Sequence, residues 1–192
     1  MTPGREERPG SPTPPPVSVL RPGNEQETAA RALREVMSQF ATGITVLTTR
    51  GERAHGMTAN AFTSVSLDPP MVLCCVARTA RMHDAISDAR HFGVSVLSTE
   101  QESVARYFAR KGRPAGMAQF DEVDWFPGRH TGVPLLVGSL AWLECDVTET
   151  YEGGDHSIFL GTVRGASRGA GQPLLFLGGG FHHHDTPTAR SA

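Results

Sequence analysis

The chain has 192 residues, of which 39% are hydrophobic, and its formal net charge is −2. This length suits one folded domain with a tail, and the near-neutral charge excludes a global basic field that would attract nucleic acid or an anionic membrane. No apolar run approaches the roughly 20 residues that span a bilayer, and the N-terminus lacks the apolar core of a secretory signal.

The chain contains three cysteines, two of them adjacent, Cys74 and Cys75. Adjacent residues of a strand point to opposite faces, and three cysteines in this arrangement do not make a disulfide framework. We therefore expect reduced, buried thiols in a cytoplasmic protein.

The N-terminal part of the chain divides into a tail and a helix. Residues 1–24 are proline-rich and are predicted to be a disordered tail, residues 25–182 the folded domain, and residues 183–192 a C-terminal tail. A helix is predicted from near Asn24, capped by Asn24 and Glu27 and ended by Gly43. Its apolar stripe indicates that the helix packs on something; the stripe consists of Leu33, Val36, Met37 and Phe40.

A hairpin and a buried strand are expected next. Residues 44–49 alternate in a β-branched run, residues 51–52 are a plausible turn, and residues 54–60 return as the second strand. Residues 71–77 are apolar throughout, which predicts a strand buried on both faces. The two prolines at 69–70 exclude helix at its start.

The middle of the chain carries two helices around one strand. Residues 79–89 are predicted to be a helix with Thr79 as a candidate cap, and residues 92–97 a strand. Residues 98–101 then match a capping box that opens a helix to about Phe108. Free N–H groups at such a helix start suit a phosphate, although the same pattern also fits a plain helix cap.

The remaining elements are predicted to be strands. Residues 123–126 form a short strand with Trp125 packing, residues 135–151 a long β-rich run, residues 152–156 a tight turn, and residues 157–163 the returning strand. Residues 174–177 are the last predicted strand. The three glycines at 178–180 that follow give the backbone conformational freedom.

The order of elements predicts a mainly β protein with flanking helices. Strands without a βαβαβ series favour a barrel over a doubly wound sheet. A Gly-x-Gly-x-x-Gly fingerprint after a strand is absent from the sequence, so a nicotinamide nucleotide would not bind by the Rossmann route.

Residues 56–66 are the most informative stretch, read as a strand followed by a loop. They carry no charge and combine short polar side chains with small apolar ones and one aromatic, Phe62. Such a segment offers hydroxyls, an amide and accessible backbone N–H groups to a large polar ligand, as a flavin mononucleotide requires. Because Ser, Thr and Gly are common in any turn, an ordinary strand and turn is the alternative.

Several motifs, taken together and in order, resemble the flavin reductase family with the FMN-binding split-barrel fold. The motifs are residues 40–46, 56–66, 67–70, 94–98 with Gln101, 154–156 and 173–176. The resemblance covers about residues 31–181. It implies a homodimeric, Greek-key split β-barrel of six strands, with flavin at the edge of the subunit interface.

The resemblance implies a flavin-binding set in three parts. Thr58, Ala59, Asn60 and Ala61 would line the isoalloxazine and ribityl chain, and Thr63 and Ser64 would hold the polyol or phosphate. The phosphate end would be closed by Ser95, Val96, Leu97, Ser98 and Gln101. Many family members have Asn where this chain has Ser95, which weakens that contact.

The resemblance also implies a nicotinamide site at Asp155, His156 and Phe181, with His156 as the one catalytic residue. The alternative for His156 is a turn histidine fixed by Asp155. Because the cofactors carry the hydride chemistry, no nucleophilic triad is expected. Residues 182–184 are three histidines, unlike the usual family ending; we predict no metal site, since no Cys/His spacing brings ligands together from different elements.

The leading hypothesis is an NAD(P)H-dependent flavin reductase that uses FMN or FAD and delivers reduced flavin to a partner monooxygenase. The lack of a basic pocket for a 2′-phosphate favours NADH over NADPH. The alternatives are a non-catalytic flavin- or haem-binding split barrel and an FMN-dependent oxidase of the same fold.

Overall fold

The structure is a computed structural model that describes residues 25–183, and the chain divides after Met37 into two units that are described separately. The predicted tail of residues 1–24 and the Asn24 cap lie outside the described residues. In the first unit, helix α1 spans Glu25–Met37. The prediction that Gly43 ends this helix is wrong, because Gly43 lies in a strand of the second unit, β1 (Thr42–Gly43).

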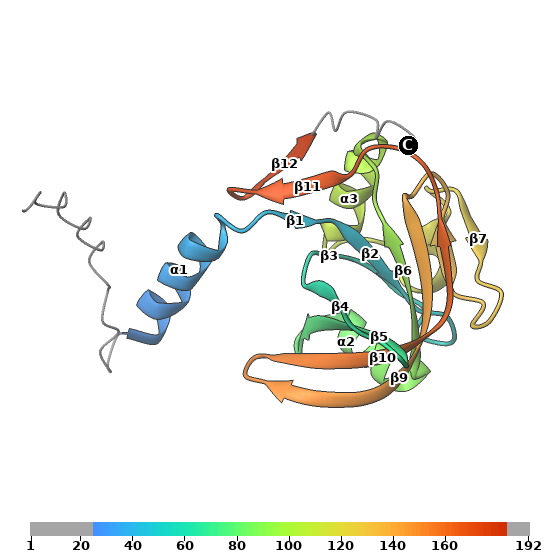
Figure 1. The fold of residues 1–192 in the computed structure, drawn as a ribbon, viewed down its shortest axis with the longest axis horizontal. Helices are drawn as coiled ribbons and strands as arrows, with labels where there is room; N and C mark the ends of the chain where they lie inside the picture. The colour runs from blue at the N-terminus through green and yellow to red at the C-terminus, as the bar shows by residue number, and fades with distance from the viewer. Residues whose placement is uncertain (1–24, 184–192) are drawn as a thin grey trace, which may run out of the picture. The chain divides into compact units, whose positions relative to one another are not determined.

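A seven-stranded antiparallel sheet dominates the second unit, with the strand order β3-β2-β6-β9-β10-β5-β4. Its strands are β2 (Thr45–Thr48), β3 (Gly56–Ala59), β4 (Phe62–Leu67), β5 (Pro70–Ala77), β6 (His91–Val96), β9 (Ala141–Gly153) and β10 (His156–Arg168). Strands β9 and β10 form the long hairpin predicted from the sequence (Figure 1).

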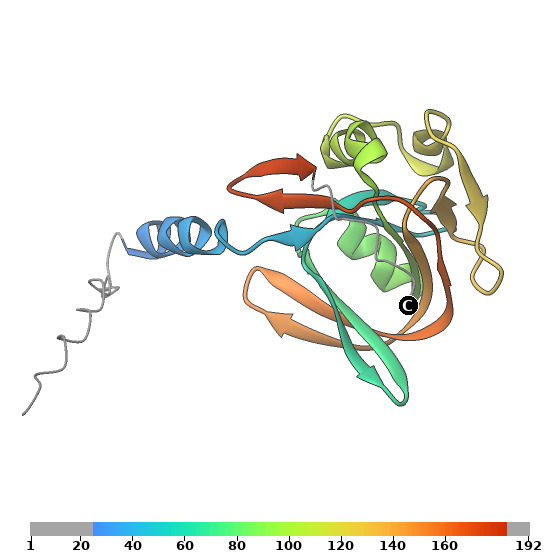
Figure 2. The ribbon, with the colours of Figure 1, turned by 45° about the horizontal axis from the view of Figure 1, so that its top comes forward.

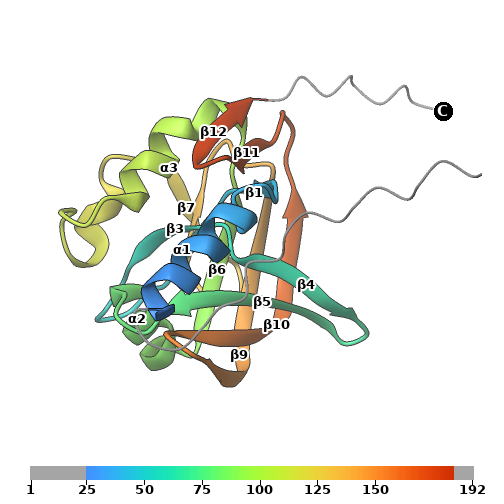
Figure 3. The ribbon, with the colours of Figure 1, turned by 90° about the vertical axis from the view of Figure 1, so that its left-hand side faces the viewer.

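The two edge strands of this sheet, β3 and β4, follow one another along the chain and are joined by residues 60–61. Because only two residues join opposite edges of a seven-stranded sheet, the sheet must curl back on itself, as Figures 2 and 3 show. Strands β3 and β4 are not neighbours in the strand order, so a seam lies between them.

Two small sheets and the remaining helices complete the second unit. Strand β11 (Leu174–Leu177) pairs with β1 on one side and with β12 (Gly180–His183) on the other, and β7 (Trp125–Pro127) pairs with β8 (Pro134–Leu136). The helical segments are α2 (Arg81–Ala89), η1 (Thr99–Gln101), α3 (Glu102–Ala109) and η2 (Gly116–Phe120).

The second unit has two apolar cores. The first joins α2 to the curled sheet through buried residues such as Met82, Phe92 and Phe159. The second joins α3 and η2 to β2, β8 and β11 and includes Phe108 and Phe120. Trp125 packs against this second core, as predicted.

Several predicted elements need correction. Residues 62–67 form strand β4 and not a loop. Strand β5 alternates between buried and half-buried residues, so only one face is fully buried, and Cys74 and Cys75 point to opposite faces as expected. Helix α2 begins after Ala80, so Thr79 is not its cap.

The C-terminal prediction also changes, because β12 follows β11. Gly178 and Gly179 have φ values of +60° and +82°. Two consecutive residues with positive φ make the tight turn that a two-residue hairpin requires. The conformational freedom of these glycines therefore permits the turn of the β11–β12 hairpin. Phe181 lies in the second strand of that hairpin.

Candidate functional site

The cradle segment, residues 56–66, occupies the seam between the two sheet edges. Its predicted flavin residues differ in exposure: Thr58 is half-buried and Ala59 buried, whereas Asn60, Ala61, Thr63 and Ser64 are exposed. The Phe62 N–H donates to the Asn60 carbonyl at 3.0 Å, which tightens the corner between the strands. The exposed members therefore present short, uncharged side chains to solvent.

Residues of α3, of the loop after it and of η2 contact the start of the cradle segment. A Cβ at Gly56 would lie 2.5 Å from the Phe108 ring, so only glycine fits there. The Gly56 N–H donates to Gln119 Oε1 at 2.8 Å, and the Arg113 guanidinium donates to the Gly56 carbonyl at 2.6 Å. The Thr58 hydroxyl donates to the Ala105 carbonyl at 2.7 Å.

Sequence reasoning missed Gln119 and Arg113 as supports of the cradle segment. Arg113 also donates to the carbonyls of Tyr107, at 3.2 Å, and Arg110, and it lies over the Tyr107 and Phe108 rings. Because the contacts of Gln119 and Arg113 with Gly56 join residues more than fifty positions apart, no local pattern around residues 111–119 could have indicated them.

The predicted phosphate-end residues are mostly buried. Ser95, Leu97, Ser98 and Gln101 are at most 6% exposed, and Val96 is half-buried. The Ser98 N–H donates to Gln101 Oε1 at 3.1 Å, one of the two bonds of the predicted capping box, which is present. The Ser98 hydroxyl donates to the Gly138 carbonyl, and the Gln101 amide donates to the Val137 carbonyl.

The backbone N–H groups at this helix start are also engaged within the chain. The Thr99 N–H donates to the Gln172 carbonyl at 2.9 Å, and the Gln101 N–H donates to the Ser98 carbonyl at 2.9 Å. Ser95 Oγ accepts the Leu136 N–H at 3.0 Å. The described polar groups of this segment therefore hold residues 136–139 and 172, and the role of the segment at a phosphate stays a prediction.

The two predicted flavin segments nevertheless lie close together. Thr45 in β2 pairs with Ala59 on one side and with Val96 on the other. Two strand spacings separate these partners, which is about 10 Å. Because α3 also contacts β3 through Thr58, these segments lie in one region of the fold, and their joint role at a flavin stays a prediction.

The predicted nicotinamide residues Asp155 and His156 lie at the tip of the β9–β10 hairpin. Gly154 has a φ of +69°, a conformation that favours glycine, and this permits the tight turn. His156 Nδ1 lies 2.8 Å from Asp155 Oδ1, and the His156 side chain is 44% exposed. An exposed imidazole beside a carboxylate can donate or accept a proton and can hydrogen-bond an amide.

The end of β5 brings the cradle segment and His156 together. The Cys75 N–H donates to the Ala61 carbonyl at 2.9 Å, and Ala77, two residues further along β5, pairs with His156 on the other side of the strand. The corner at residues 60–61 and His156 thus flank one end of β5, about two strand spacings apart.

Phe181, the third predicted nicotinamide residue, lies on another element. Its ring centroid is 5.7 Å from that of Phe176, and the Arg106 guanidinium lies 4.8 Å from the Phe181 centroid. His183 Nε2 lies 2.8 Å from Glu102 Oε2, which ties β12 to α3. Phe181 is therefore held against α3, and its role at the nicotinamide stays a prediction.

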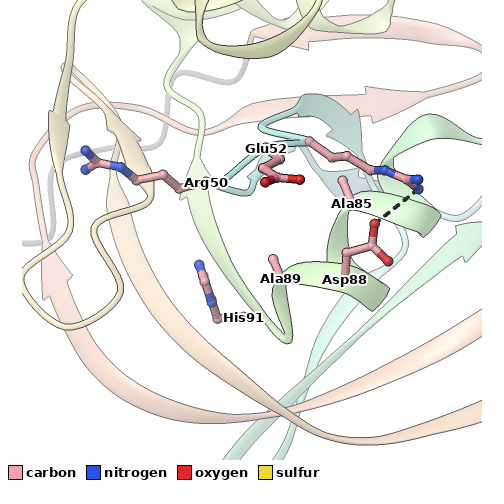
Figure 4. Close-up of a pocket in the computed structure, with 8 residues that line it drawn as sticks. Arg50, Glu52, Ala85, Asp88, Ala89 and His91 are labelled. Atoms are coloured by element: carbon pink, nitrogen blue, oxygen red, sulfur yellow. Dashed lines mark ion pairs between the residues drawn. The ribbon is translucent and has the colours of Figure 1, made fainter.

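Two described cavities contain none of the predicted flavin or nicotinamide residues. One, of about 450 Å³, lies between the β2–β3 turn and the end of α2, with His91 on its wall (Figure 4). Its Arg53 pairs with Asp88 at 3.1 Å. The other, of about 400 Å³, lies beside Phe126, Trp142 and Glu144. Of the predicted flavin residues, Asn60, Ala61, Thr63 and Ser64 therefore lie on the exposed surface and outside these two cavities.

The thiols show no sign of reactivity. Cys74, Cys75 and Cys145 are free, and burial raises the pKa of each thiol, that of Cys145 to about 12. Within residues 25–183, no group of three His, Cys, Asp or Glu side chains could hold a metal ion. None of the described helices is long and apolar enough to cross a membrane.

The second unit is a curled, mainly β unit with an uncharged seam and a nearby Gly-Asp-His turn. The chain belongs to the flavin reductase-like domain family, which matches residues 37–185. It is 48% identical over 168 residues to an NADH-dependent FAD reductase of Streptomyces globisporus, covering 87% of this chain and 90% of that protein.

Two further relatives support the assignment. The chain is 42% identical to the NADH-dependent FMN reductase SmoA of Agrobacterium fabrum, covering 85% of this chain and 89% of that one. Among solved structures, it is similar to BorF, the flavin reductase component of a bacterial two-component tryptophan halogenase, with a TM-score of 0.77 and 46% identity. That match covers 80% of this chain and 97% of BorF.

Proposed function

We propose that this protein is an NADH-dependent flavin reductase that reduces FMN or FAD and supplies diffusible reduced flavin to a separate flavin-dependent monooxygenase. The observation that carries the proposal is that the exposed, uncharged corner at residues 60–61 and His156 flank the same end of β5, about two strand spacings apart. The activities in the printed names of the relatives, NADH-dependent FAD and FMN reductases, support the same chemistry.

The cradle segment would bind the flavin. Asn60, Ala61, Thr63 and Ser64 are exposed and short, so they let a planar ring and a polyol approach the backbone. Thr58 and Ala59 would support them from the strand, and residues 95–98 with Gln101 would form the phosphate end. The neutral side chains at this seam suit a flavin that leaves after reduction, because they provide no strong charge pairing.

His156 would act on the nicotinamide side. Bound flavin would accept the hydride from NADH, so the protein needs to align the two rings and exclude other geometries, and such alignment can lower the barrier by several kcal/mol. The exposed His156 imidazole would hydrogen-bond the nicotinamide amide or move a proton, with Asp155 orienting its Nδ1 at 2.8 Å. Phe181 would pack near the rings.

We further propose that the curled sheet is a split β-barrel and that the protein works as a homodimer with flavin at the subunit edge. The seam between β3 and β4 is where such a barrel would be open. The exposed cradle segment, which no described cavity encloses, suits a site that a second subunit completes.

The decisive experiment follows NADH and NADPH consumption by the purified protein with FMN, with FAD and without added flavin. A flavin reductase consumes NADH only when flavin is present, at a rate that saturates with flavin concentration. Failure to consume either coenzyme at any flavin concentration would reject the reductase and leave a flavin- or haem-binding protein. Oxidation sustained by tightly held FMN alone would indicate an oxidase of the same fold.

A further inference from the structure

Helix α2 makes a direct polar contact with the strand that carries His156. His83 Nε2 lies 2.9 Å from Ser157 Oγ, and the His83 ring packs edge-on against Phe159, with ring centroids 5.4 Å apart. The Ser157 residue is 5% exposed and the His83 side chain 21% exposed. His83 thus holds two residues on the inner face of β10, immediately after the hairpin turn.

Ser157 follows His156, and neighbouring residues of a strand point to opposite faces. The backbone of residue 157 is therefore fixed from the inner face while the His156 side chain stands on the outer face. A second contact fixes the same turn, because the Arg78 N–H, between β5 and α2, donates to the Asp155 carbonyl at 3.0 Å. The β5–α2 connection and α2 thus brace the turn from two sides.

The group of Ser157, His83 and Asp84 is not a nucleophilic triad. Ser157 is buried beneath the hairpin, where a substrate carbonyl has no access. Asp84 Oδ1 lies 3.6 Å from His83 Nδ1, beyond hydrogen-bonding distance, and the carboxylate of the exposed Asp84 also lies 4.0 Å from Arg53. The hydrogen bond in this group is the one between His83 and Ser157, which joins α2 to β10.

We propose that His83 is a positioning residue for the nicotinamide step: it sets the orientation of His156 through Ser157 and touches neither NADH nor flavin. The inference rests on the proposed role of His156. It gives α2 a function beyond filling the first core, since α2 then determines how the Gly-Asp-His turn meets the reductant.

The test combines single and double variants of the full-length chain. His83→Leu removes the hydrogen bond to Ser157 and leaves an apolar side chain that can pack on Phe159. His83→Gln retains a polar amide that can reach Ser157, and Ser87→Ala is the control. Ser87 lies one turn further along α2 and donates only to the carbonyl of His83, at 2.8 Å. Each variant is measured for kcat and KM with NADH, flavin Kd and Tm.

We expect His83→Leu to lower kcat/KM for NADH about tenfold, because a misplacement of about 1 Å can cost up to about 10²-fold. Flavin Kd should stay within about twofold of the unmodified chain, His83→Gln should recover most of the loss, and Ser87→Ala should behave as the unmodified chain. In a His156→Ala background, His83→Leu should cause no further loss, since its effect passes through His156.

The outcomes separate two failures. If His156→Ala itself leaves NADH-dependent reduction unchanged, the proposed role of His156 is wrong and the inference goes with it. If His156→Ala is impaired but His83→Leu has full activity, or adds its full loss to that of His156→Ala, the role of His156 stands and His83 does not position it. Equal losses of NADH kinetics and flavin binding in folded His83→Leu would likewise overturn the positioning role.

Discussion

His55 immediately precedes the cradle segment and is held in its neutral form. Burial, together with the positive charges of Arg113 and Arg81, lowers the pKa of His55 from 6.5 to about 4. A histidine with a lowered folded pKa stabilises the fold above its unfolded pKa, and that stabilisation is lost as the pH falls from about 6.5 to about 4.

We therefore predict that acid weakens the region around the cradle segment through His55. The Tm of the unmodified chain should fall steadily between pH 6.5 and pH 4, and His55→Gln, which cannot gain a proton, should flatten that fall. The same slope in both proteins would assign the acid sensitivity to other groups.

Ser64 and Ser98 separate the exposed and buried parts of the predicted phosphate site. Because only FMN has a phosphate, we predict that Ser64→Ala combined with Ser98→Ala weakens FMN binding more than riboflavin binding. Since the Ser98 hydroxyl already donates to Gly138, Ser64 should account for most of the loss, about tenfold for one hydrogen bond to a charged group. Isothermal titration with both ligands checks this, and equal losses for both ligands would contradict a phosphate contact.

His156 allows a direct test of the nicotinamide site. His156→Ala should lower the rate of NADH-dependent flavin reduction at least about tenfold, because the reductant loses an aligning contact, while flavin Kd stays unchanged. Stopped-flow reduction and flavin titration give the two values. Asp155→Asn, which alters the partner of His156 Nδ1, should give a smaller loss of reduction rate; an equal loss of flavin binding in His156→Ala would show that the residue has another role.

At the scale of elements, sequence patterns predicted the features that depend on neighbouring residues in the chain. Alternation and a Gly-Asp turn predicted the β9–β10 hairpin, and the capping box at Ser98 is present. The patterns failed where contacts with distant residues determine the structure. The small polar residues of β4 resemble a loop, but their pairing with β5 makes them a strand. Likewise, the burial of Ser98 and Gln101 depends on residues 137–139, which no spacing near them indicates.

Arg113 joins the loop after α3 to the start of β3, and a lysine cannot replace it. A guanidinium can donate to several carbonyls while lying flat on aromatic rings, whereas an ammonium is a point charge. We predict that Arg113→Lys lowers the free energy of unfolding by about 1–2 kcal/mol and increases hydrogen exchange at residues 56–58. Urea unfolding and hydrogen-exchange measurements check this, with Arg110→Lys, an exposed neighbour, as the control. Equal hydrogen exchange in both variants would show that Arg113 does not stabilise the start of β3.

At the scale of the molecule, the curl of the seven-stranded sheet accounts for the location of the candidate site. Joining opposite edges through residues 60–61 leaves one seam, and the seam carries the uncharged side chains. A chain that left this seam without a ligand or a partner would expose unpaired strand edges, which proteins normally cover. The proposed flavin and the proposed second subunit therefore meet the same structural need.

Helix α1 allows a test of the proposed homodimer. It has 13 residues, and a helix this short is only marginally stable alone in water. Its apolar residues Leu33, Val36 and Met37 are nevertheless 51–68% exposed. In the proposed homodimer a second copy of the chain would cover them, which would make α1 a dimer contact.

Val36→Glu should accordingly raise the dimer dissociation constant at least about tenfold, because a buried, unpaired carboxylate is costly. Sedimentation equilibrium measures the shift, and Arg31→Glu, a charge change away from the apolar stripe, should leave the dimer intact. If flavin lies at the subunit edge, flavin affinity should fall in parallel with dimerisation as the Val36→Glu protein is diluted. A monomeric variant with unchanged flavin affinity would show that one chain holds the flavin alone, and a dimer unaffected by Val36→Glu would place the subunit contact elsewhere.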